Sequence, residues 1–417
     1  GGVRVILATN VAETSLTVPG VHVVVDSGLE RRVRFSPRTG MDHWTTVPAS
    51  RASAEQRAGR AGRQGPGVCL RGWDARTRRE DHAPPAILEA DLAPLVLETA
   101  LWGADSPEAL TWITPPPAAG IERAQALLRT LELMDDGGRL TDMGREAARL
   151  GVHPRLGKML IAARGSGHLD TAAAAAALLE NPAGLADGDV DFRSRLDLLR
   201  PKGPKAGPYA EAVRRIHDEA GRLLGALTGG PRKLSPDRID PSLAGGVLLA
   251  AYPDRAAQRT RLDDPHTSRW RLASGRGAIV RGPLAGGEFL VVADLDGGEH
   301  DARVFTAAPV TREDLAGGRA GAVRNTWLLA WRGWQPKPRV ETRLGALVLA
   351  ARSEPTVPEK ILREAALARL RASGLDALPW REPTRRFLAR CLCVARWGGE
   401  PGWPDVRDER LLDRAGE

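Results

Sequence analysis

The chain has 417 residues, of which 42% are hydrophobic and 27% are charged. This composition excludes a wholly disordered or fibrous protein, and the length corresponds to roughly three typical domains. The 60 lysines and arginines against 52 acidic residues give a net charge of +8, which favours a polyanionic partner without proving one.

Cysteine content and hydropathy restrict the class of protein further. The three cysteines, Cys69, Cys391 and Cys393, cannot form a disulfide framework or supply the ligand set of a structural zinc site. No run of about 18 apolar residues is present, so no membrane span is expected. We therefore expect a soluble protein of the reducing cytoplasm with no membrane partner. The chain begins with Gly and opens directly into an apolar run, which predicts that an upstream segment is missing.

Taken in order, the predicted elements describe a multidomain chain of α/β, then α, then β character. Residues 3–8 and 21–25 are almost continuously apolar, as in strands of a parallel sheet that is covered on both faces. Residues 33–47 contain a Ser-Pro-Arg-Thr-Gly turn and predict a β-hairpin. Residues 84–227 carry helical periodicity, interrupted by a tight turn at 135–138. Short alternating runs between 270 and 308 predict a small antiparallel barrel, and helices return from about 345.

The segment Gln56-Arg-Ala-Gly-Arg-Ala-Gly-Arg63 carries the clearest chemical signal. Ser53 precedes Gln56 by three residues, the spacing of a capping box, which predicts that a helix begins at Ser53. Helical spacing then places Gln56, Arg60 and Arg63 on one face. Gly59 and Gly62 keep the neighbouring surface low, so a ligand or another domain can approach the backbone.

This helix face suits a nucleoside triphosphate. Guanidinium groups bind phosphate oxygens in pairs and stabilise charge on a transferred phosphoryl group, and the glutamine could orient the attacking water. The alternative is a solvated basic helix face that pairs with nearby acids.

Three segments together resemble motifs V and VI of the DEAH-box helicases. They are Ala8-Thr-Asn-Val-Ala-Glu-Thr-Ser-Leu-Thr17, Val23-Val-Val-Asp-Ser-Gly28 and Gln56–Arg63. Further along, Leu140–Arg145 and His153–Leu160 resemble the winged-helix to ratchet passage of that family. Tyr252-Pro-Asp-Arg255, Ser274–Gly277 and Leu290–Gly297 resemble the bacterial HrpB-type subgroup. The resemblance covers essentially the whole chain.

The resemblance implies a domain order and a set of site residues. The order is the distal part of a second RecA-like domain with a partial parallel sheet (1–75), a winged helix (76–148), a ratchet-like helical bundle (149–235), an OB-like barrel (236–344) and the beginning of a HrpB-type C-terminal domain (345–417). Gln56, Arg60 and Arg63 would contact the ATP phosphates as catalytic groups. Thr9, Asn10 and Thr14 would lie at the nucleic-acid backbone, and Glu13 would belong to the network that couples the two.

The chain also departs from the family pattern. A helicase needs a Gly-x-x-x-x-Gly-Lys-Ser/Thr loop for phosphates and an acidic motif for Mg²⁺, and neither occurs here. The nearest match, Gly151–Lys158, has the wrong spacing and lacks the hydroxyl. We therefore expect the C-terminal part of an ATP-dependent helicase that moves 3′ to 5′ along single-stranded RNA or DNA. The ligands for Mg²⁺ would lie in an N-terminal RecA-like domain, and the chain alone would be inactive. The alternative function is a non-catalytic nucleic-acid-binding module.

Other candidate residues give weaker signals. His153, His217 and His300 lack partners at metal-ligand spacing, so we expect surface or capping roles and no metal site. Trp327, Trp331 and Trp334 fit either a stacking stripe or core packing. Arg269, Arg271 and Arg276 fit either nucleic-acid contacts on the barrel or a solvated strand face.

Overall fold

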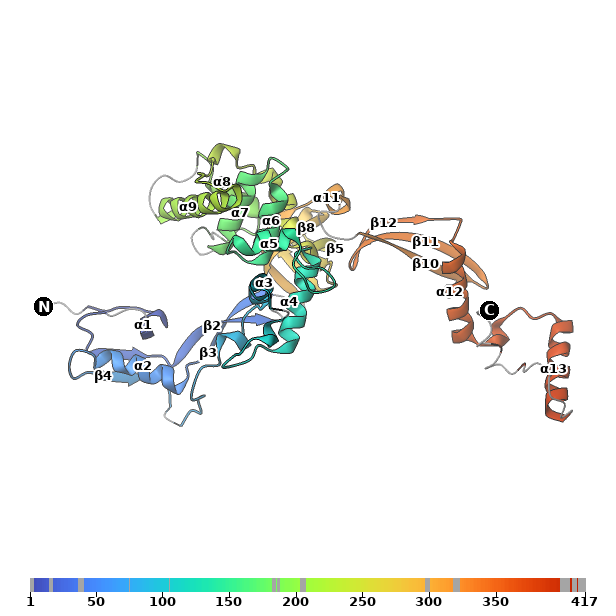
Figure 1. Cartoon of the computed structure of the whole chain (residues 1–417), viewed down its shortest axis with the longest axis horizontal. Coiled ribbons are helices and arrows are strands. Elements are labelled where there is room, and N and C mark those ends of the chain that lie inside the picture. Colours follow the sequence, from blue (N-terminus) through green and yellow to red (C-terminus); the bar gives the residue numbers. More distant parts are fainter. Residues whose placement is uncertain are drawn as a thin grey trace. The chain divides into compact units, whose positions relative to one another are not determined.

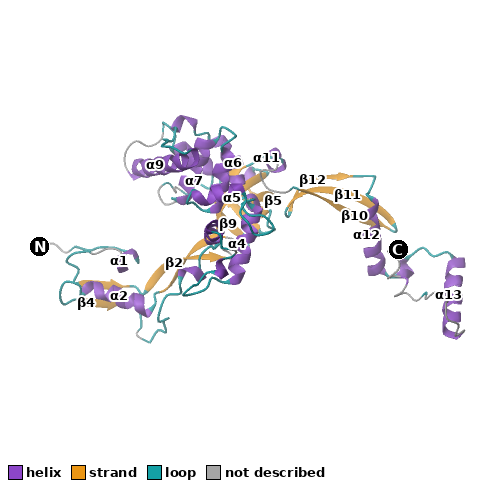
Figure 2. Ribbon diagram, viewed as in Figure 1, coloured by secondary structure: helices purple, strands orange, loops and turns teal. Residues whose placement is uncertain are grey.

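The computed structural model describes residues 4–14, 18–36, 41–74, 76–104, 106–181, 185, 188–202, 208–296, 301–317, 323–397, 406 and 411. The chain divides into two compact units, residues 1–321 and residues 322–417 (Figure 1). The first unit mixes helices and strands, whereas the second consists of an antiparallel sheet followed by helices (Figure 2). The predicted mixed multidomain character is therefore confirmed.

A small parallel sheet lies in the N-terminal part of the first unit. β1 (Val23–Asp26) pairs with β4 (Val68–Arg71), so that Val23 lies opposite Val68 and Asp26 opposite Arg71. The helix α2 (Arg51–Ala61) precedes β4 in the chain and packs on both strands. The prediction of a parallel sheet in this region is confirmed.

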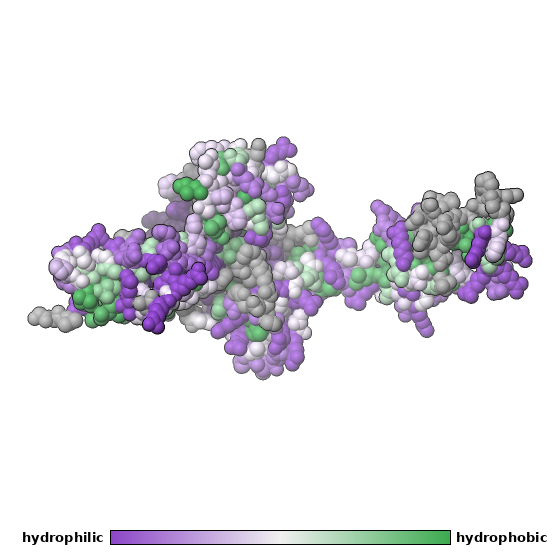
Figure 3. Space-filling model, turned by 90° about the horizontal axis from the view of Figure 1, so that it is seen from below, coloured by the Kyte–Doolittle hydropathy of each residue, from purple (hydrophilic) through white to green (hydrophobic). Residues whose placement is uncertain are grey.

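The apolar runs of this region are less buried than predicted. Residues 4–8 form no strand and are exposed, and Val23 and Val25 of β1 expose 60% and 76% of their surface. Successive side chains of a strand point to opposite faces, and α2 covers only one face of this two-stranded sheet. Figure 3 accordingly shows apolar atoms at the surface of the N-terminal part. Within the described residues, the prediction of strands covered on both faces is wrong.

The predicted β-hairpin is present. β2 (Leu29–Ser36) and β3 (Met41–Pro48) run antiparallel, with Leu29 opposite Pro48, and the turn residues 37–40 lie outside the described residues. Gly28, just before β2, has φ +69°, and a Cβ there would come within 2.3 Å of the Trp73 ring. Only glycine satisfies both conditions.

A helical region follows. Its first three long helices are α3 (Ala93–Trp102), α4 (Ala118–Thr130) and α5 (Asp142–Arg149), and they share an apolar core. Met134 and Leu140 form a β-bridge on either side of the predicted tight turn at residues 135–138. The remaining α-helices of the region are α6 (Pro154–Ala163), α7 (Leu169–Glu180), α8 (Phe192–Leu198), α9 (Pro208–Thr228) and α10 (Ala244–Ala251). The alanines at 172–177 of α7 are completely buried. None of the described helices is long and apolar enough to cross a membrane.

Single turns of 3-10 helix connect these elements. They are η1 (Ala86–Leu88), η2 (Pro107–Ala109), η4 (Pro236–Arg238), η5 (Pro241–Leu243), η6 (Pro253–Arg255), η7 (Pro283–Gly286) and η8 (Leu375–Ala377).

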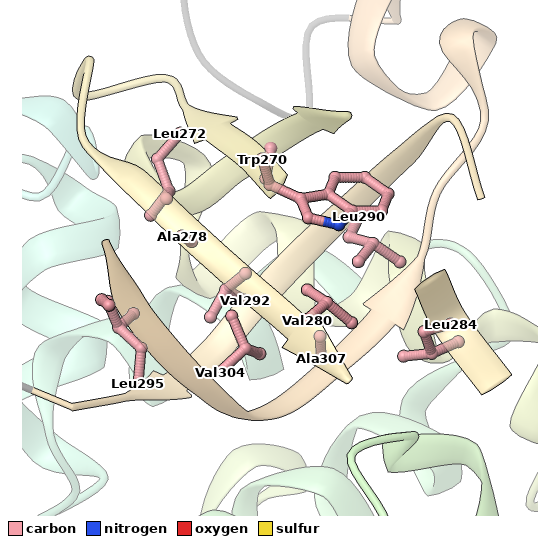
Figure 4. Close-up of a cluster of buried hydrophobic side chains, with 12 residues drawn as sticks. Trp270, Leu272, Ala278, Val280, Leu284, Leu290, Val292, Leu295, Val304 and Ala307 are labelled. Carbon is pink, nitrogen blue, oxygen red and sulfur yellow. The ribbon is translucent and has the colours of Figure 1, made fainter. Parts of the chain in front are cut away.

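The predicted barrel is a closed five-stranded barrel with the strand order β5-β6-β7-β9-β8. Its strands are β5 (Ala256–Asp264), β6 (Thr267–Leu272), β7 (Gly277–Arg281), β8 (Phe289–Leu295) and β9 (Ala302–Pro309). β7 and β9 are parallel, and the other pairs are antiparallel. Trp270 lies in the interior among Leu290, Val280 and other apolar side chains (Figure 4). Its indole Nε1 donates a hydrogen bond to Ser268 Oγ at 2.7 Å, which satisfies the one polar group of this buried ring.

The barrel is shorter than the predicted interval 236–344. It ends at Pro309 and is followed by the short helix α11 (Arg312–Ala316). Residues 324–344 instead belong to a separate sheet in the second unit. Alternating strands look alike in sequence whichever sheet they join, so the pattern did not separate them.

The second unit contains a three-stranded antiparallel sheet and two helices. The strands are β10 (Arg324–Arg332), β11 (Gln335–Leu344) and β12 (Leu347–Ser353), and the helices are α12 (Glu359–Ser373) and α13 (Glu382–Trp397). The prediction that helices begin at about residue 345 is wrong, because β12 occupies 347–353.

Trp327, Trp331 and Trp334 lie on the sheet side of the second unit rather than on a helix. Trp327 and Trp331 belong to β10, and Trp334 lies in the turn that leads to β11. The rings of Trp331 and Trp334 meet edge to face with centroids 6.3 Å apart, and the guanidinium of Arg369 from α12 lies over both rings. All three tryptophans are half-buried. Packing, the second of the two predicted roles, is what the described contacts of Trp331 and Trp334 show.

Candidate functional site

The N-cap of α2 lies three residues earlier than predicted. Ser50 is its N-cap, and the Oγ atom of Ser50 accepts a hydrogen bond from the amide of Ser53 at 3.2 Å. The amides of Arg51 and Ala52 donate to the carbonyl oxygens of Glu80 and Asp81. These bonds satisfy donors that the start of a helix leaves free, so Ser53 is not needed as a cap.

Arg57 is the centre of the polar network at α2. The residues predicted from the sequence motif were its neighbours Gln56, Arg60 and Arg63. Its guanidinium donates to Glu13 Oε2 at 3.1 Å, to Asp26 Oδ1 at 3.1 Å and to the carbonyl oxygen of Leu29 at 3.0 Å. Glu30 lies 3.4 Å away on the remaining side. Burial lowers the pKa of Arg57, but the hydrogen bonds to Glu13 and Asp26 outweigh it, so the pKa is raised above its ordinary value.

Ser53 joins the same network from one turn earlier on α2. Its hydroxyl donates to Glu13 Oε2 at 2.6 Å. Glu13 lies in the short helix α1 (Val11–Thr14), so two side chains of α2 hold the carboxylate of α1. The predicted coupling residue therefore has direct partners, Arg57 and Ser53, that the sequence did not identify.

Arg60 holds the backbone of α1 rather than a side chain. Its Nε donates to the carbonyl oxygen of Glu13 at 2.7 Å, and its Nη2 donates to the same oxygen. Arg57 and Arg60 thus bind the side chain and the main chain of one residue. The two segments that resemble motifs V and VI are therefore in contact through Glu13.

The three residues predicted to share a helix face do not all do so. Gln56 lies within α2 and is exposed, and within the described residues its side chain has no hydrogen-bond partner. Arg63 is exposed and lies beyond the end of the helix, because α2 ends at Ala61 with Gly62 as its C-cap. Helical spacing thus holds for Gln56 and Arg60 and fails for Arg63.

The predicted nucleic-acid residues surround α1. Thr9 and Asn10 are exposed, and their carbonyl oxygens accept the amides of Ala12 and Glu13 at 3.1 and 3.0 Å. Neither side chain makes a hydrogen bond to another described residue, so both side chains are accessible to a ligand. Thr14 is the last residue of α1, and its side chain lies outside the described residues.

One cavity of about 510 Å³ joins most of these residues. Its lining includes Thr9, Asn10, Arg60 and Arg63, together with the apolar strand β1, whereas Gln56 is not part of it. A cavity with guanidinium groups on one side and exposed hydroxyl and amide groups on another can hold a polyanion.

The signal for the missed residues is present in the sequence but is not local. Glu13, Asp26 and Glu30 lie within 18 residues of one another, ahead of an arginine-rich helix. They come from three different elements, α1, β1 and β2, and only the folded chain places them around Arg57.

The remaining candidates have structural partners. His153 caps α6, since its Nδ1 accepts the amide of Arg155 at 3.2 Å, and its Nε2 lies 3.0 Å from Asp91. His217 Nε2 lies 2.9 Å from the carbonyl oxygen of Leu199, and His300 lies outside the described residues. Lys158 forms an ion pair with Glu132, and its surroundings on α6 do not form a phosphate loop.

The barrel arginines differ from one another. Arg269 pairs with Asp263 and Asp301, and the Nη2 of Arg276 donates to the carbonyl oxygen of Asp296 at 3.4 Å. Arg271 is exposed on β6. The ion pairs of Arg269 are those expected of a solvated strand face, the second of the two predicted roles.

Known proteins are similar to this chain. The model of the helicase conserved C-terminal domain matches residues 1–65. The chain is 33% identical over 417 residues to the ATP-dependent RNA helicase HrpB of Escherichia coli (strain K12), and the match covers 98% of the chain and 48% of that protein. It is 40% identical over 164 residues to the pre-mRNA-splicing factor ATP-dependent RNA helicase prp22 of Schizosaccharomyces pombe, which covers 39% of the chain and 14% of that protein.

Two solved structures of Escherichia coli HrpB, described as a DExH-box NTPase and as a DEAH/RHA helicase, match at 32% identity. Their TM-scores are 0.68 and 0.69, with 97% of the chain covered and 48% and 49% of those chains. The chain therefore spans about half the length of the curated protein that it matches throughout. The chain is therefore HrpB-like: nearly its whole length is similar to the C-terminal half of HrpB, a DEAH/RHA helicase, and the helicase conserved C-terminal domain matches its N-terminal end.

Proposed function

We propose that the chain is the C-terminal part of a cytoplasmic ATP-dependent RNA helicase that couples ATP hydrolysis to 3′ to 5′ movement along a single strand and to its unwinding. Residues 1–75 would complete a second RecA-like domain. The helices at 76–148 and 149–235 would act as a winged helix and a ratchet bundle, and the closed barrel would be an OB-like barrel. The second unit would be the beginning of a HrpB-type C-terminal domain. The similarity to proteins named as ATP-dependent RNA helicases supports this proposal.

The observation that carries the proposal is the link between α2 and α1. Arg60 donates two hydrogen bonds to the carbonyl oxygen of Glu13, and Glu13 follows the exposed residues Thr9 and Asn10 by only a few positions. A guanidinium that turns from this carbonyl oxygen towards a phosphate would release α1. The grip of Thr9, Asn10 and Thr14 on a nucleic-acid backbone would then depend on the nucleotide state.

The described residues fit the phosphates of ATP in their donor chemistry. Arg63 is exposed at the cavity and Arg60 lines it, and two guanidiniums offer several N–H donors to phosphate oxygens. Gln56 lies one helical turn before Arg60 on α2 and is exposed. ATP would supply the phosphoryl group, and these three side chains would stabilise its developing charge and orient the attacking water.

The described residues do not fit Mg²⁺. The carboxylates of Glu13, Asp26 and Glu30 are the nearest candidates, and each is engaged by Arg57. A metal site there would have to displace this cation. We therefore assign no metal ligand in this part of the chain and place the Mg²⁺ ligands and the phosphate loop in an N-terminal RecA-like domain.

The test is RNA-stimulated ATP hydrolysis by the longer protein that includes that N-terminal domain. Arg63→Ala should lower kcat by about 10³-fold, the scale for loss of an arginine that stabilises phosphoryl transfer. Arg51→Ala is the matched control, because Arg51 lies on the same helix and its side chain is 69% exposed in a surface ion pair. Equal rates for Arg63→Ala and the wild type would contradict the assignment. RNA binding without any ATP turnover in the wild type would instead favour a non-catalytic module.

A further inference from the structure

The sheet of the second unit carries most of its charge on one face. In the antiparallel pairing of β10 and β11, Arg324 lies opposite Arg343, Leu328 opposite Arg339, and Ala330 opposite Lys337. Paired residues of a sheet point to the same side, and so do residues two apart along a strand. Arg324, Arg332, Lys337, Arg339 and Arg343 therefore share one side, which we call the basic face.

The basic face holds five cations and a single carboxylate on these two strands, a net charge of +4. The carboxylate belongs to Glu341, which is buried and is held by Arg339 and Arg343. Arg324, Arg332 and Lys337 are exposed and have no ion-pair partner among the described residues. Glu341 thus offsets part of the charge of two arginines and leaves three cations uncompensated.

The opposite face of the same sheet is occupied. It carries Trp327, Trp331 and Val340, and α12 supplies Arg369 over the rings of Trp331 and Trp334. The indole Nε1 of Trp334 also donates to the carbonyl oxygen of Ala377 at 2.6 Å. The helical part of the unit therefore contacts the face opposite the basic face and leaves the basic face exposed to solvent.

We propose that the basic face binds the phosphate backbone of single-stranded nucleic acid without regard to its sequence. Lys337 and Arg339 lie two residues apart on an extended strand, which is about 6.6 Å and comparable to the spacing of successive phosphates in an extended strand. The face carries Leu328 but no aromatic ring on which a base could stack. It therefore contacts phosphates rather than bases.

This interaction goes beyond the proposed motor function, because it requires neither a nucleotide nor the residues of α1 and α2. A second grip of this kind would keep the protein on its strand while the motor site releases it. Such binding depends on counterion release and weakens steeply with salt.

The test is the affinity of the 417-residue chain for a fluorescently labelled 20-nucleotide oligouridylate, followed by anisotropy between about 50 and 200 mM salt without nucleotide. The combined variant Arg324→Gln, Arg332→Gln, Lys337→Gln should bind at least about tenfold more weakly at the lower salt concentrations. The slope of log Kd against log salt should fall by about 2, the value for three lost phosphate contacts on a single strand.

Two matched variants separate the effect of where the charges lie from the effect of their number. Lys360→Gln, Arg363→Gln, Arg371→Gln removes the same charge from exposed positions of α12 and should leave affinity and slope nearly unchanged. Arg324→Lys with Arg332→Lys keeps the charge of the basic face and should retain most of the affinity. An equal loss in the α12 variant, or no loss in the basic-face variant, overturns the proposal.

Two further measurements cover a variant that fails to fold and binding at the motor site. If the glutamine variant loses its circular-dichroism signal, crosslinks of 4-thiouridine RNA on the wild-type chain decide the question: crosslinks within residues 324–343 support the proposal, and their absence overturns it. Asn10→Ala tests the motor site independently. Weaker binding in that variant alone would support the site at α1 and overturn the basic face.

Discussion

The barrel and the N-terminal part of the first unit are held together by different forces. In the barrel, Leu290, Val292 and Trp270 belong to a continuous buried apolar cluster. In the described residues between 4 and 71, the buried apolar side chains are only those of Ala49, Ala54 and Ala61. That region depends instead on ion pairs and hydrogen bonds around Arg57.

This difference matches what the proposed function requires of each region. Close-packed apolar side chains have one arrangement and resist change, which suits a scaffold. A guanidinium can exchange one oxygen acceptor for another at small cost, as a site that responds to a nucleotide requires. We therefore expect substitutions in the barrel to act on global stability and substitutions at α2 to act locally.

The largest expected effect comes from the barrel core. Trp270→Ala should lower the free energy of unfolding by about 3–5 kcal/mol, since it removes a buried indole and leaves a cavity. The measurement is chemical denaturation followed by far-UV circular dichroism. Trp102→Ala is the control, because Trp102 is 89% exposed, and it should cost less than about 0.5 kcal/mol. Similar losses in both variants would contradict a barrel held by packing.

The polar network gives the next effect. Arg57→Ala leaves Glu13, Asp26 and Glu30 without their shared cation, and we expect a local cost of about 3 kcal/mol. Hydrogen exchange should accelerate at the amides of α1 and α2 and stay unchanged in the barrel. Arg51→Ala removes only a surface ion pair and should change exchange very little. Faster exchange throughout the barrel would contradict the separation of the two regions.

A smaller effect should appear at acid pH, where the helical region meets the start of the barrel. Arg155 of α6 donates to both carboxylate oxygens of Asp254 at 2.6 and 2.9 Å. Burial raises the pKa of Asp254, but the positive charge and hydrogen bonds of Arg155 lower it by more. The pKa therefore falls from 3.8 to about 2. The folded pKa lies below the unfolded one, so the stabilisation is complete above about pH 4 and is lost as the pH falls through about 2.

Acid unfolding of the wild type and of Asp254→Asn measures this contribution. The variant should be less stable at neutral pH, and its stability should fall less between about pH 4 and pH 2. If the stability of the two proteins depended on pH in the same way, Asp254 would make no such contribution.

The smallest expected effect is at the N-cap of α2. Ser50→Ala should cost about 1 kcal/mol of local stability, because the amide of Ser53 loses its acceptor. Ser50→Asp should keep most of it. Hydrogen exchange at the first turn of α2 measures both, and unchanged exchange in Ser50→Ala would contradict the assignment of Ser50 as the cap.

Sequence patterns predicted those elements whose periodicity is local. The hairpin at β2 and β3, the turn at residues 135–138 and the barrel strands each follow from alternation or turn residues within a few positions. The cap of α2 was misplaced because Ser53, unlike Ser50, has a glutamine three residues later, whereas in the structure Ser50 caps the helix and the loop at Glu80 and Asp81 accepts its first amides. The position of Arg63 past the helix end followed from where α2 stops.

The sequence by itself determined the motifs, their order and therefore the resemblance to DEAH-box helicases, because these are properties of neighbouring residues. Only the tertiary structure showed that Arg57 and Arg60 both hold Glu13, and that β10 and β11 place five cations on one side of a separate sheet. The first fact depends on hydrogen bonds between segments far apart in the chain, and the second depends on the register of two paired strands. Local propensity carries no information about such pairings.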